Sequence, residues 1–281
     1  MLGQRVITAF VLLCLLTVLL SIPSAWPFLI FLSLTCALAA WEWGRLLWGR
    51  GTQVPLFMGL LLFVITVAQA WMWMPSGSGD QRLLLWSTLF CVLGWLVFVS
   101  AALIRAQTQV RQSALLWSLF AGITLFATWS CLAWLFLGNG AQFVLTMLAV
   151  IWIADIFAYF AGRAFGRYKL APRISPGKTV EGAIVGVLGV VAWVVATALY
   201  WPDSFGFELA QRWGLFGAAV LAVFLALFSI AGDLFESLLK RRASMKDSSG
   251  LLPGHGGVYD RIDAVVAVVP LAFLLLGHVP W

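Results

Sequence analysis

The sequence predicts an all-α, polytopic membrane protein with about nine transmembrane helices, a cytoplasmic N-terminus and a periplasmic C-terminus. Of its 281 residues, 63% are hydrophobic and only 10% are charged, whereas charged residues make up about a quarter of an ordinary soluble domain. The apolar residues form long continuous runs, and they do not alternate with polar residues as they would in an outer-membrane barrel. These observations exclude a soluble domain and a membrane β-barrel.

The transmembrane helices are predicted from the length of the apolar runs. A helix needs about 20 apolar residues to cross a hydrocarbon core of about 30 Å. Nine candidate spans satisfy this requirement: 6–22, 27–43, 55–74, 83–104, 114–137, 142–161, 182–201, 214–239 and 264–279. The first span also resembles a signal peptide, because Arg5 and the small residues Ser24 and Ala25 flank it. The second span follows at once, which favours a retained helix.

The basic residues predict the orientation of these spans. The net charge is +6, from 17 Lys and Arg against 11 Asp and Glu, and basic residues collect in cytoplasmic loops. With nine spans and the N-terminus inside, 15 of the 17 basic residues are cytoplasmic, and only Arg82 and Arg212 lie outside. A missed span would invert every later loop, so this division supports nine spans. The positive charge therefore indicates orientation, and nucleic-acid binding is not expected.

Polarity divides the chain into two predicted parts. Residues 1–140 are interpreted as a transmembrane scaffold of about five helices, because Glu42 and Asp80 are the only acids before Val150 and both lie in or near loops. Residues 141–281 are interpreted as the catalytic transmembrane domain, with cytoplasmic loops 162–181 and 240–263. Five of the eleven acids lie within 31 residues of this second part.

Two groups of polar residues lie inside predicted spans. Asp155 is well inside the sixth span, and an acid in hydrocarbon is costly enough to be a functional candidate by default. Pairing with Arg163 or with a neighbouring helix is the structural alternative. The second group forms one helical stripe at the end of the eighth span, where carboxylates that could bind a cation join a hydroxyl and an ammonium group: Asp233, Glu236, Ser237 and Lys240.

The loop after the eighth span has the composition of a phosphate and metal site. Three glycines surround His255, and they allow backbone N–H groups to approach a ligand closely. Asp260 and Asp263 can share one face of the following helix. Carboxylates this close repel each other unless a cation lies between them, and oxygen ligands beside phosphate are typical of Mg²⁺. A glycine turn with helix-capping aspartates is the alternative.

The other cytoplasmic loop contains Gly177-Lys178-Thr179, which is similar to the end of a P-loop. Pro172 stands where a P-loop requires glycine, and no β-strand is expected before it, so the P-loop interpretation fails. A basic segment remains, in which Lys178 and Thr179 lead into the seventh helix, whose N-terminal amides can face an anion. Positive-inside bias alone explains the arginines of this loop.

The run from Ser237 to Asp263 resembles the signature of the phosphatidate cytidylyltransferase family, also called CDP-diacylglycerol synthases. Segments 155–163 and 175–182 are similar to two further blocks of that family, so the resemblance covers a little under half of the chain. One departure is Ser244 and Met245, where many members carry a glycine. Every fixed position of the signature is present: Ser237, Leu239, Lys240, Arg241, Lys246, Asp247, Ser249, Leu252, Pro253, His255, Gly256, Gly257, Val258, Asp260, Arg261, Ile262 and Asp263.

The resemblance implies transfer of a cytidylyl group from CTP to phosphatidic acid, which gives CDP-diacylglycerol and pyrophosphate at the cytoplasmic face. The lipid phosphate is itself the nucleophile, so cations and fixed donors would provide most of the catalysis. The resemblance implies Asp233 and Asp260 as ligands of Mg²⁺, with a second cation left open. Asp247 and Asp263 are the second choices for this role.

The same resemblance implies the remaining site residues and partners. The catalytic residues are expected to be Asp233, Lys240, Asp247 and Asp260. The substrate-binding residues are expected to be Lys178, Thr179, Ser237, Arg241, Lys246, His255, Gly256, Gly257 and Arg261. CTP, phosphatidic acid and the lipid bilayer are the expected partners, a homodimer is left open, and the bacterial inner membrane is the expected location.

Two alternative functions are kept. One is a CTP-dependent cytidylyltransferase that acts on another membrane lipid phosphate, because no feature of the sequence identifies the acyl-bearing part of the substrate. The other, less favoured, is a transporter. A transporter would spread its polar residues through several spans near the bilayer midplane, whereas here they gather at one face and in one third of the chain.

Overall fold

The computed structural model describes residues 11, 14–49, 51–76, 81–108 and 113–277. Residues 6–10, 12 and 13 of the predicted span 6–22 lie outside the described residues, whereas residues 14–21 are helical. The described elements are α2 (Trp26–Trp48), α3 (Val54–Ser76), α4 (Gln81–Gly94), the π-helical turn η1 (Trp95–Val99), α5 (Ser100–Arg105), α6 (Ala114–Phe165), β1 (Lys169–Ala171), β2 (Ser175–Thr179), α7 (Val180–Tyr200), α8 (Phe205–Arg242), α9 (Tyr259–Ile262) and α10 (Val265–Leu276).

The helices follow the predicted spans closely and confirm the helical membrane fold. Within the described residues, six helices are long and apolar enough to cross a membrane. α6 combines two predicted spans, and it bends at Gly140, where φ is 80°. α8 begins before the predicted span 214–239 and bends at Gly214, where φ is 70°. Glycine adopts such positive φ values without steric cost. The nine-span count and the orientation stay predictions.

Capping side chains fix where three of these helices begin. The hydroxyls of Ser113, Thr179 and Ser204 accept hydrogen bonds from the N–H groups three residues later, at the starts of α6, α7 and α8. Each cap satisfies one amide that the first helical turn leaves without a backbone partner. As a result, α7 begins two residues before the predicted boundary, and Thr179 is its cap.

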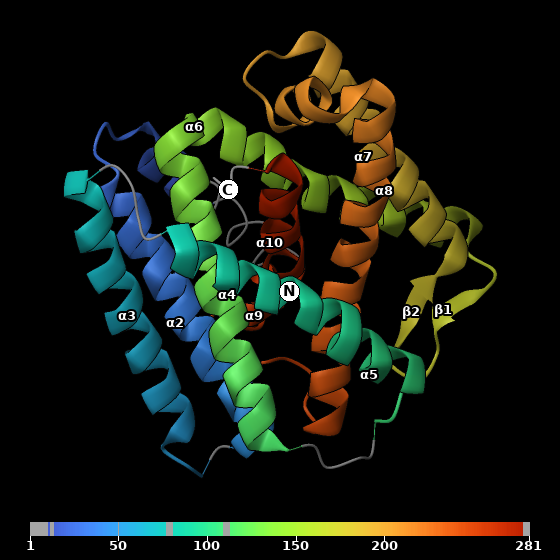
Figure 1. Ribbon diagram of the computed structural model, residues 1–281. Helices are drawn as coiled ribbons and strands as arrows, with labels where there is room; N and C mark the ends of the chain where they lie inside the picture. The colour runs from blue at the N-terminus through green and yellow to red at the C-terminus, as the bar shows by residue number, and fades with distance from the viewer. Residues whose placement is uncertain (1–10, 12–13, 50, 77–80, 109–112, 278–281) are drawn as a thin grey trace.

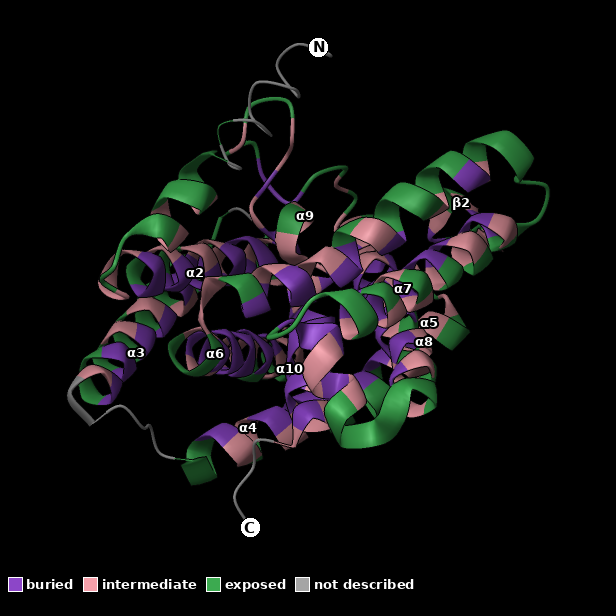
Figure 2. Ribbon diagram, turned by 90° about the horizontal axis from the view of Figure 1, so that it is seen from above, coloured by how far each residue is buried: buried purple, intermediate pink, exposed green. Residues whose placement is uncertain are grey.

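The last helix, α10, runs through the middle of the bundle (Figure 1). It contacts α4, α6 and α8, and Val266, Ala267, Val268 and Val269 are fully buried. The view in Figure 2 shows the same arrangement, with buried segments near the centre and exposed segments on the outer helices. The described part of α10 has only 12 residues. Its packing therefore places Asp263, which precedes it, inside the protein.

A small β-hairpin interrupts the helical pattern between α6 and α7. Strands β1 and β2 are antiparallel, with Lys169 opposite Thr179 and Ala171 opposite Ser175. The expectation that no strand lies in this loop was therefore wrong. The P-loop is still excluded, because Lys178 lies within strand β2 itself and not in a loop that follows a strand.

One aromatic cluster joins the two predicted parts of the chain. Trp43 of α2 stacks on Tyr259 of α9 with ring centroids 4.8 Å apart, and it meets Phe235 of α8 at 5.6 Å. Phe235 also contacts Trp95 of η1 at 5.5 Å and Trp117 of α6 at 5.1 Å. Such contacts stabilise a core beyond the effect of buried area alone. The scaffold therefore packs against Phe235 and Tyr259, which lie on either side of the loop between α8 and α9. This loop, residues 243–258, is called the signature loop below.

Candidate active site

Three carboxylates meet where α8 passes the start of α10. Asp233 and Glu236 lie on α8, Asp263 directly precedes α10, and one oxygen from each lies within 4.8 Å of the others. The close approach depends on Gly232, because an added Cβ there would lie 2.5 Å from the backbone oxygen of Asp263. Oxygen ligands gathered this closely suit a divalent cation.

The chemistry of this acid cluster fits a cation. Oε1 of Glu236 is buried and has no hydrogen-bond partner among the described residues, and a buried carboxylate oxygen without a donor is costly. Burial raises the pKa of Asp263, and the nearby charge of Asp233 raises it further. A cation at this position would relieve both effects, because it supplies the missing positive charge and displaces the proton.

Lys240 and Asp260 lie beside this cluster. Nζ of Lys240 is 2.6 Å from Oε2 of Glu236 and 2.7 Å from Oδ1 of Asp260. Oδ2 of Asp260 accepts hydrogen bonds from Ser248 N at 3.0 Å, Ser248 Oγ at 2.8 Å and Gly257 N at 2.7 Å. Burial alone would raise the pKa of Asp260, but the hydrogen bonds that it accepts from Lys240 and Gly257 hold the pKa well below its ordinary value.

Asp260 therefore already accepts hydrogen bonds at both oxygens from the protein's own groups. Of the two predicted metal ligands, the structure places Asp233 in the acid cluster and Asp260 next to it, bridged by Lys240. Asp263, a second choice from the sequence, belongs to the cluster, together with Glu236 of the predicted stripe. The ligand role of Asp260 stays a prediction.

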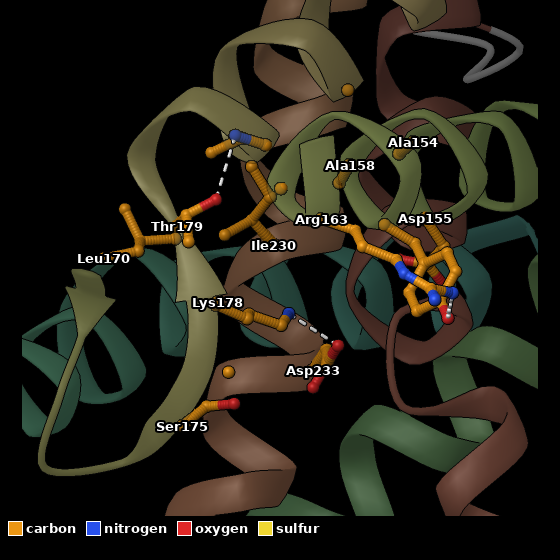
Figure 3. A pocket seen from close by; sticks show the side chains of 16 residues that line it. Ala154, Asp155, Ala158, Arg163, Leu170, Ser175, Lys178, Thr179, Ile230 and Asp233 are labelled. Atoms are coloured by element: carbon orange, nitrogen blue, oxygen red, sulfur yellow. Dashed lines mark hydrogen bonds and ion pairs between the residues drawn. The ribbon is translucent and has the colours of Figure 1, made fainter. Parts of the chain in front are cut away.

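A cavity of about 470 Å³ lies against the acid cluster and is lined by α6, the β-hairpin, α7 and α8. Figure 3 shows Lys178, from β2, pointing toward Asp233 of α8, and their Nζ and Oδ2 atoms are 2.5 Å apart. Their side chains are 25% and 30% exposed, so the pair is open to a ligand that enters the cavity. The structure thus brings Lys178, which was expected to bind substrate, next to an acid of the cluster, a contact that was not predicted.

Three polar side chains of α6 are among those that line the same cavity: Asp155, Tyr159 and Arg163. Asp155 is exposed, and it forms no ion pair within the part of the chain that the structure describes. Arg163 Nη1 lies 3.5 Å from the Tyr159 hydroxyl, a long contact. The structural alternative for Asp155, an ion pair with Arg163, is therefore not what the structure shows. Asp155 faces the cavity as an acid open to a ligand.

The other predicted residues of the helices mostly contact the protein. Thr179 lines the cavity, but its hydroxyl caps α7 by accepting from Gly182 N at 3.2 Å. Ser237 Oγ lies 3.4 Å from Asp233 Oδ1 and orients that carboxylate. Arg241 Nε donates to the Ile174 carbonyl at 3.3 Å, which joins α8 to the hairpin.

The predicted residues of the signature loop and α9 are arranged around Asp260. Arg261 Nη2 donates to the His255 carbonyl at 3.0 Å, while Nδ1 of His255 is buried without a hydrogen-bond partner among the described residues. Lys246 and Asp247 are exposed. The glycine N–H expected to bind phosphate, that of Gly257, instead donates to Asp260. Gly256 packs against the same carboxylate, since an added Cβ would lie 2.7 Å from Asp260 Oδ2.

The contribution of Glu42 was not predicted from the sequence. This residue was expected in the scaffold, in or near a loop, but the structure places it inside α2 with no exposed surface. Its carboxylate accepts hydrogen bonds from the signature loop and the start of α9, from Ser248, Ser249, Val258 and Tyr259. The available signal was an acid within the apolar run at the end of the second predicted span, which is a functional candidate by the same reasoning applied to Asp155.

The chain is similar to known proteins over nearly its whole length. The sequence profile of the Cytidylyltransferase family matches residues 3–279. The chain belongs to this family. It is 39% identical over 288 residues to a phosphatidate cytidylyltransferase of Pseudomonas aeruginosa, a match that covers 100% of this chain and 99% of the relative. It is 32% identical over 292 residues to the enzyme of the same name from Haemophilus influenzae, with 96% of each chain covered.

A third cytidylyltransferase relative matches a shorter segment. The phosphatidate cytidylyltransferase of Thermotoga maritima is 42% identical over 137 residues, which are 48% of this chain and 49% of the relative. The family match spans both predicted parts of the chain, whereas the resemblance noted from the sequence rested on the second part. Family membership confirms that resemblance.

Proposed function

We propose that this protein transfers the cytidylyl group of CTP to phosphatidate, forming CDP-diacylglycerol and pyrophosphate in phospholipid synthesis. The observation that carries the proposal is the acid cluster beside a cavity that Lys178 and Arg163 line, in a chain that matches cytidylyltransferases over nearly its whole length. The helical membrane fold fits a lipid substrate, because the acyl chains can stay in the bilayer beside the bundle.

The reaction is a displacement at the α-phosphorus of CTP. An oxygen of the lipid phosphate forms a bond to that phosphorus, the bond to the bridging oxygen of the β-phosphate breaks, and pyrophosphate leaves with the bonding electrons. Because the lipid phosphate is largely ionised near neutral pH, the chain need not supply a nucleophile or a general base. Its task is to bring two polyanions together, which requires positive charge and fixed hydrogen-bond donors.

The acid cluster is the part of the site that suits Mg²⁺. Asp233, Glu236 and Asp263 would hold the ion, and Asp260 lies close enough to Lys240 to orient its ammonium group. A bound Mg²⁺ would offset the charge of the triphosphate and of the leaving pyrophosphate. Exposed Asp247 at the loop surface is a further candidate for contact with the same group.

The basic side chains are proposed to bind phosphate oxygens. Lys178 lies in the cavity wall, and its pair with Asp233 can open when a triphosphate enters. Lys246, in the loop after α8, and Arg261, in α9 next to Asp260, are both exposed and are further candidates for binding phosphate oxygens. In the predicted nine-span topology this face of the protein is cytoplasmic, where CTP is present, and we propose the bacterial inner membrane as its location.

The proposal is tested by incorporation of radiolabelled CTP into phosphatidic acid by the purified protein in detergent. We expect CDP-lipid to form with Mg²⁺, and to be lost with EDTA or in Asp233→Asn and Asp263→Asn. Glu208→Gln is the matched control, because Glu208 is an acid in the first turn of the same helix, far from the cluster. Full activity of the Asp233 and Asp263 variants at limiting Mg²⁺ would disprove the metal assignment.

The acceptor is tested in the same assay. If active wild-type protein labels another phospholipid phosphate and not phosphatidic acid, the cytidylyl transfer stands and the acceptor is wrong. If no acceptor is labelled, the transporter alternative and an inactive homologue return as explanations. Either lipid phosphate would meet the same basic residues in the cavity wall, so only the product distinguishes them.

A further inference from the structure

The most unusual buried group outside the acid cluster is the carboxylate of Glu42. It has no exposed surface, and four donors surround it. Ser249 Oγ and Val258 N donate to Oε1 at 2.5 Å and 3.0 Å, and Tyr259 N donates to Oε2 at 2.6 Å. The Ser248 hydroxyl lies 3.0 Å from Oε2, and it shares its single proton between Glu42 and Asp260. All four donors belong to one segment, residues 248–259, which is more than 200 positions away in sequence.

This pattern is not that of a structural ion pair between helices. Within the described part of the chain, no Lys or Arg forms a salt bridge with Glu42. Two of its donors are backbone N–H groups at the start of α9, and such groups bind carboxylates as they bind other anions. The carboxylate of α2 therefore holds the backbone of residues 248–259, up to the first residue of α9, and is not paired with a basic side chain.

Ser248 links Glu42 to the site. Its hydroxyl lies 3.0 Å from Glu42 Oε2 and 2.8 Å from Asp260 Oδ2, and its backbone N–H also donates to Asp260 Oδ2. Asp260 in turn accepts from Lys240 Nζ, which contacts Glu236 of the acid cluster. One hydrogen-bonded chain thus runs from α2 to the cluster, and its geometry depends on where Glu42 holds the loop.

Close packing confines the loop to this arrangement. An added Cβ at Gly257 would meet the Ser248 hydroxyl and would lie 2.5 Å from Glu42 Oε1. The Glu42 side chain therefore fills the space inside the turn, and Trp43, its neighbour, stacks on Tyr259. These contacts leave no space between the turn and the Glu42 side chain.

We propose that Glu42 is a positioning residue, which fixes residues 248–259 and thereby sets Asp260 and Lys240 against the acid cluster. Glu42 touches no substrate in this proposal. The catalytic consequence rests on the proposed function, whereas the structural consequence, an ordered loop, does not. Two separate readouts therefore distinguish failure of this inference from failure of the proposed function.

The experiment uses the full-length protein with Glu42→Gln, Ser249→Ala and Ser33→Ala. Glu42→Gln keeps the shape but turns one acceptor into an NH₂ group, which faces a backbone N–H that cannot rotate to accept. Ser249→Ala removes one donor to Glu42 without touching Asp260. Ser33→Ala is the matched control, because it removes a buried hydrogen bond of the same helix, to Trp129 Nε1, far from the loop.

The first readout is hydrogen–deuterium exchange of the peptide that contains residues 257–259. We expect at least tenfold faster exchange in Glu42→Gln, about threefold faster exchange in Ser249→Ala and no change in Ser33→Ala, because the two carboxylates protect these amides. The second readout is steady-state kinetics. We expect kcat to fall at least tenfold in Glu42→Gln, with KM for CTP changed less than threefold, since the binding cavity stays intact.

The proposal is overturned if Glu42→Gln exchanges and turns over like the wild type, or if Ser33→Ala shows the same losses. Should Glu42→Gln fail to fold, Ser249→Ala decides the question, and wild-type exchange and kcat in that variant overturn the proposal. If the wild type transfers no cytidylyl group to any lipid, the proposed function fails. The exchange measurement still tests whether Glu42 holds residues 248–259 in place.

Discussion

The two lysine–carboxylate contacts of the site differ in burial, and that difference predicts their contributions to stability. Lys240 lies between Glu236 and Asp260, and the side chains are 17%, 2% and 5% exposed. Removal of the ammonium group leaves two buried carboxylates facing each other. Breaking a buried pair in this way costs about 3–5 kcal/mol. We therefore expect Lys240→Met to lower the free energy of unfolding by about that amount.

The contact between Lys178 and Asp233 is more open to solvent. Its side chains are 25% and 30% exposed, so solvent screens the charges, and loss of such a pair costs about 1 kcal/mol or less. Lys178→Met is expected to abolish activity while it changes stability little. Lys246→Met is the stability control for the Lys240 and Lys178 variants, because Lys246 is exposed and forms no ion pair within the described residues.

The assay is equilibrium unfolding by SDS in mixed micelles at pH 7, followed by tryptophan fluorescence. The expected order of destabilisation is Lys240→Met well above Lys178→Met, with Lys246→Met equal to the wild type. If Lys178→Met destabilises the protein as much as Lys240→Met, the argument from burial is refuted. If Lys240→Met lowers the free energy of unfolding by less than about 1 kcal/mol, the ion pairs of Lys240 contribute no more to stability than those of an exposed lysine.

Three further outcomes are expected. Gly257→Ala should lower kcat at least tenfold in the CTP assay, because its Cβ would lie 2.5 Å from Glu42 Oε1, whereas Gly250→Ala, with no atom within 4 Å, should match the wild type. Gly186→Val should lower the midpoint of SDS unfolding, since even a Cβ there would lie 2.8 Å from a backbone oxygen of α6. An unchanged midpoint would show that α6 and α7 can move apart without a loss of stability. The third outcome concerns pH. The lowered pKa of Asp260 makes its carboxylate fully stabilising above about pH 4, and this stabilisation is lost as pH falls through the folded-state pKa. The difference in unfolding midpoint between the wild type and Asp260→Asn should therefore hold from about pH 7 to about pH 5 and narrow below about pH 4, and a constant difference down to pH 3 would contradict it.

Much of the fold could be predicted from local properties of the sequence. Apolar runs of helical length set the positions of the described helices to within a few residues, because a membrane span must satisfy its backbone hydrogen bonds internally. The remaining boundary differences come from caps such as Ser204, which begins α8 well before the apolar run of that helix. The hairpin 169–179 was not predicted, because its short polar strands have no hydrophobic alternation.

The site was predicted in part. The stripe of Asp233, Glu236 and Lys240 follows from helical periodicity, and the structure gathers these residues as expected. Periodicity could not show that Lys240 would bridge Asp260, nor that the N–H group of Gly257 would bind a carboxylate of the protein itself. Those contacts join segments that the sequence presents as separate motifs.

The sequence by itself determined that the protein is a helical membrane protein, that it belongs with cytidylyltransferases, and that its chemistry gathers near residues 233–263. Only the tertiary structure decided which acids form the cluster, how α10 is buried among its neighbours, and that Glu42 of the first half holds the signature loop. The physical reason is the range of the interactions. Hydropathy, helical periodicity and capping act between residues close in the chain, whereas the hydrogen bonds and close packing of the site join residues more than 200 positions apart.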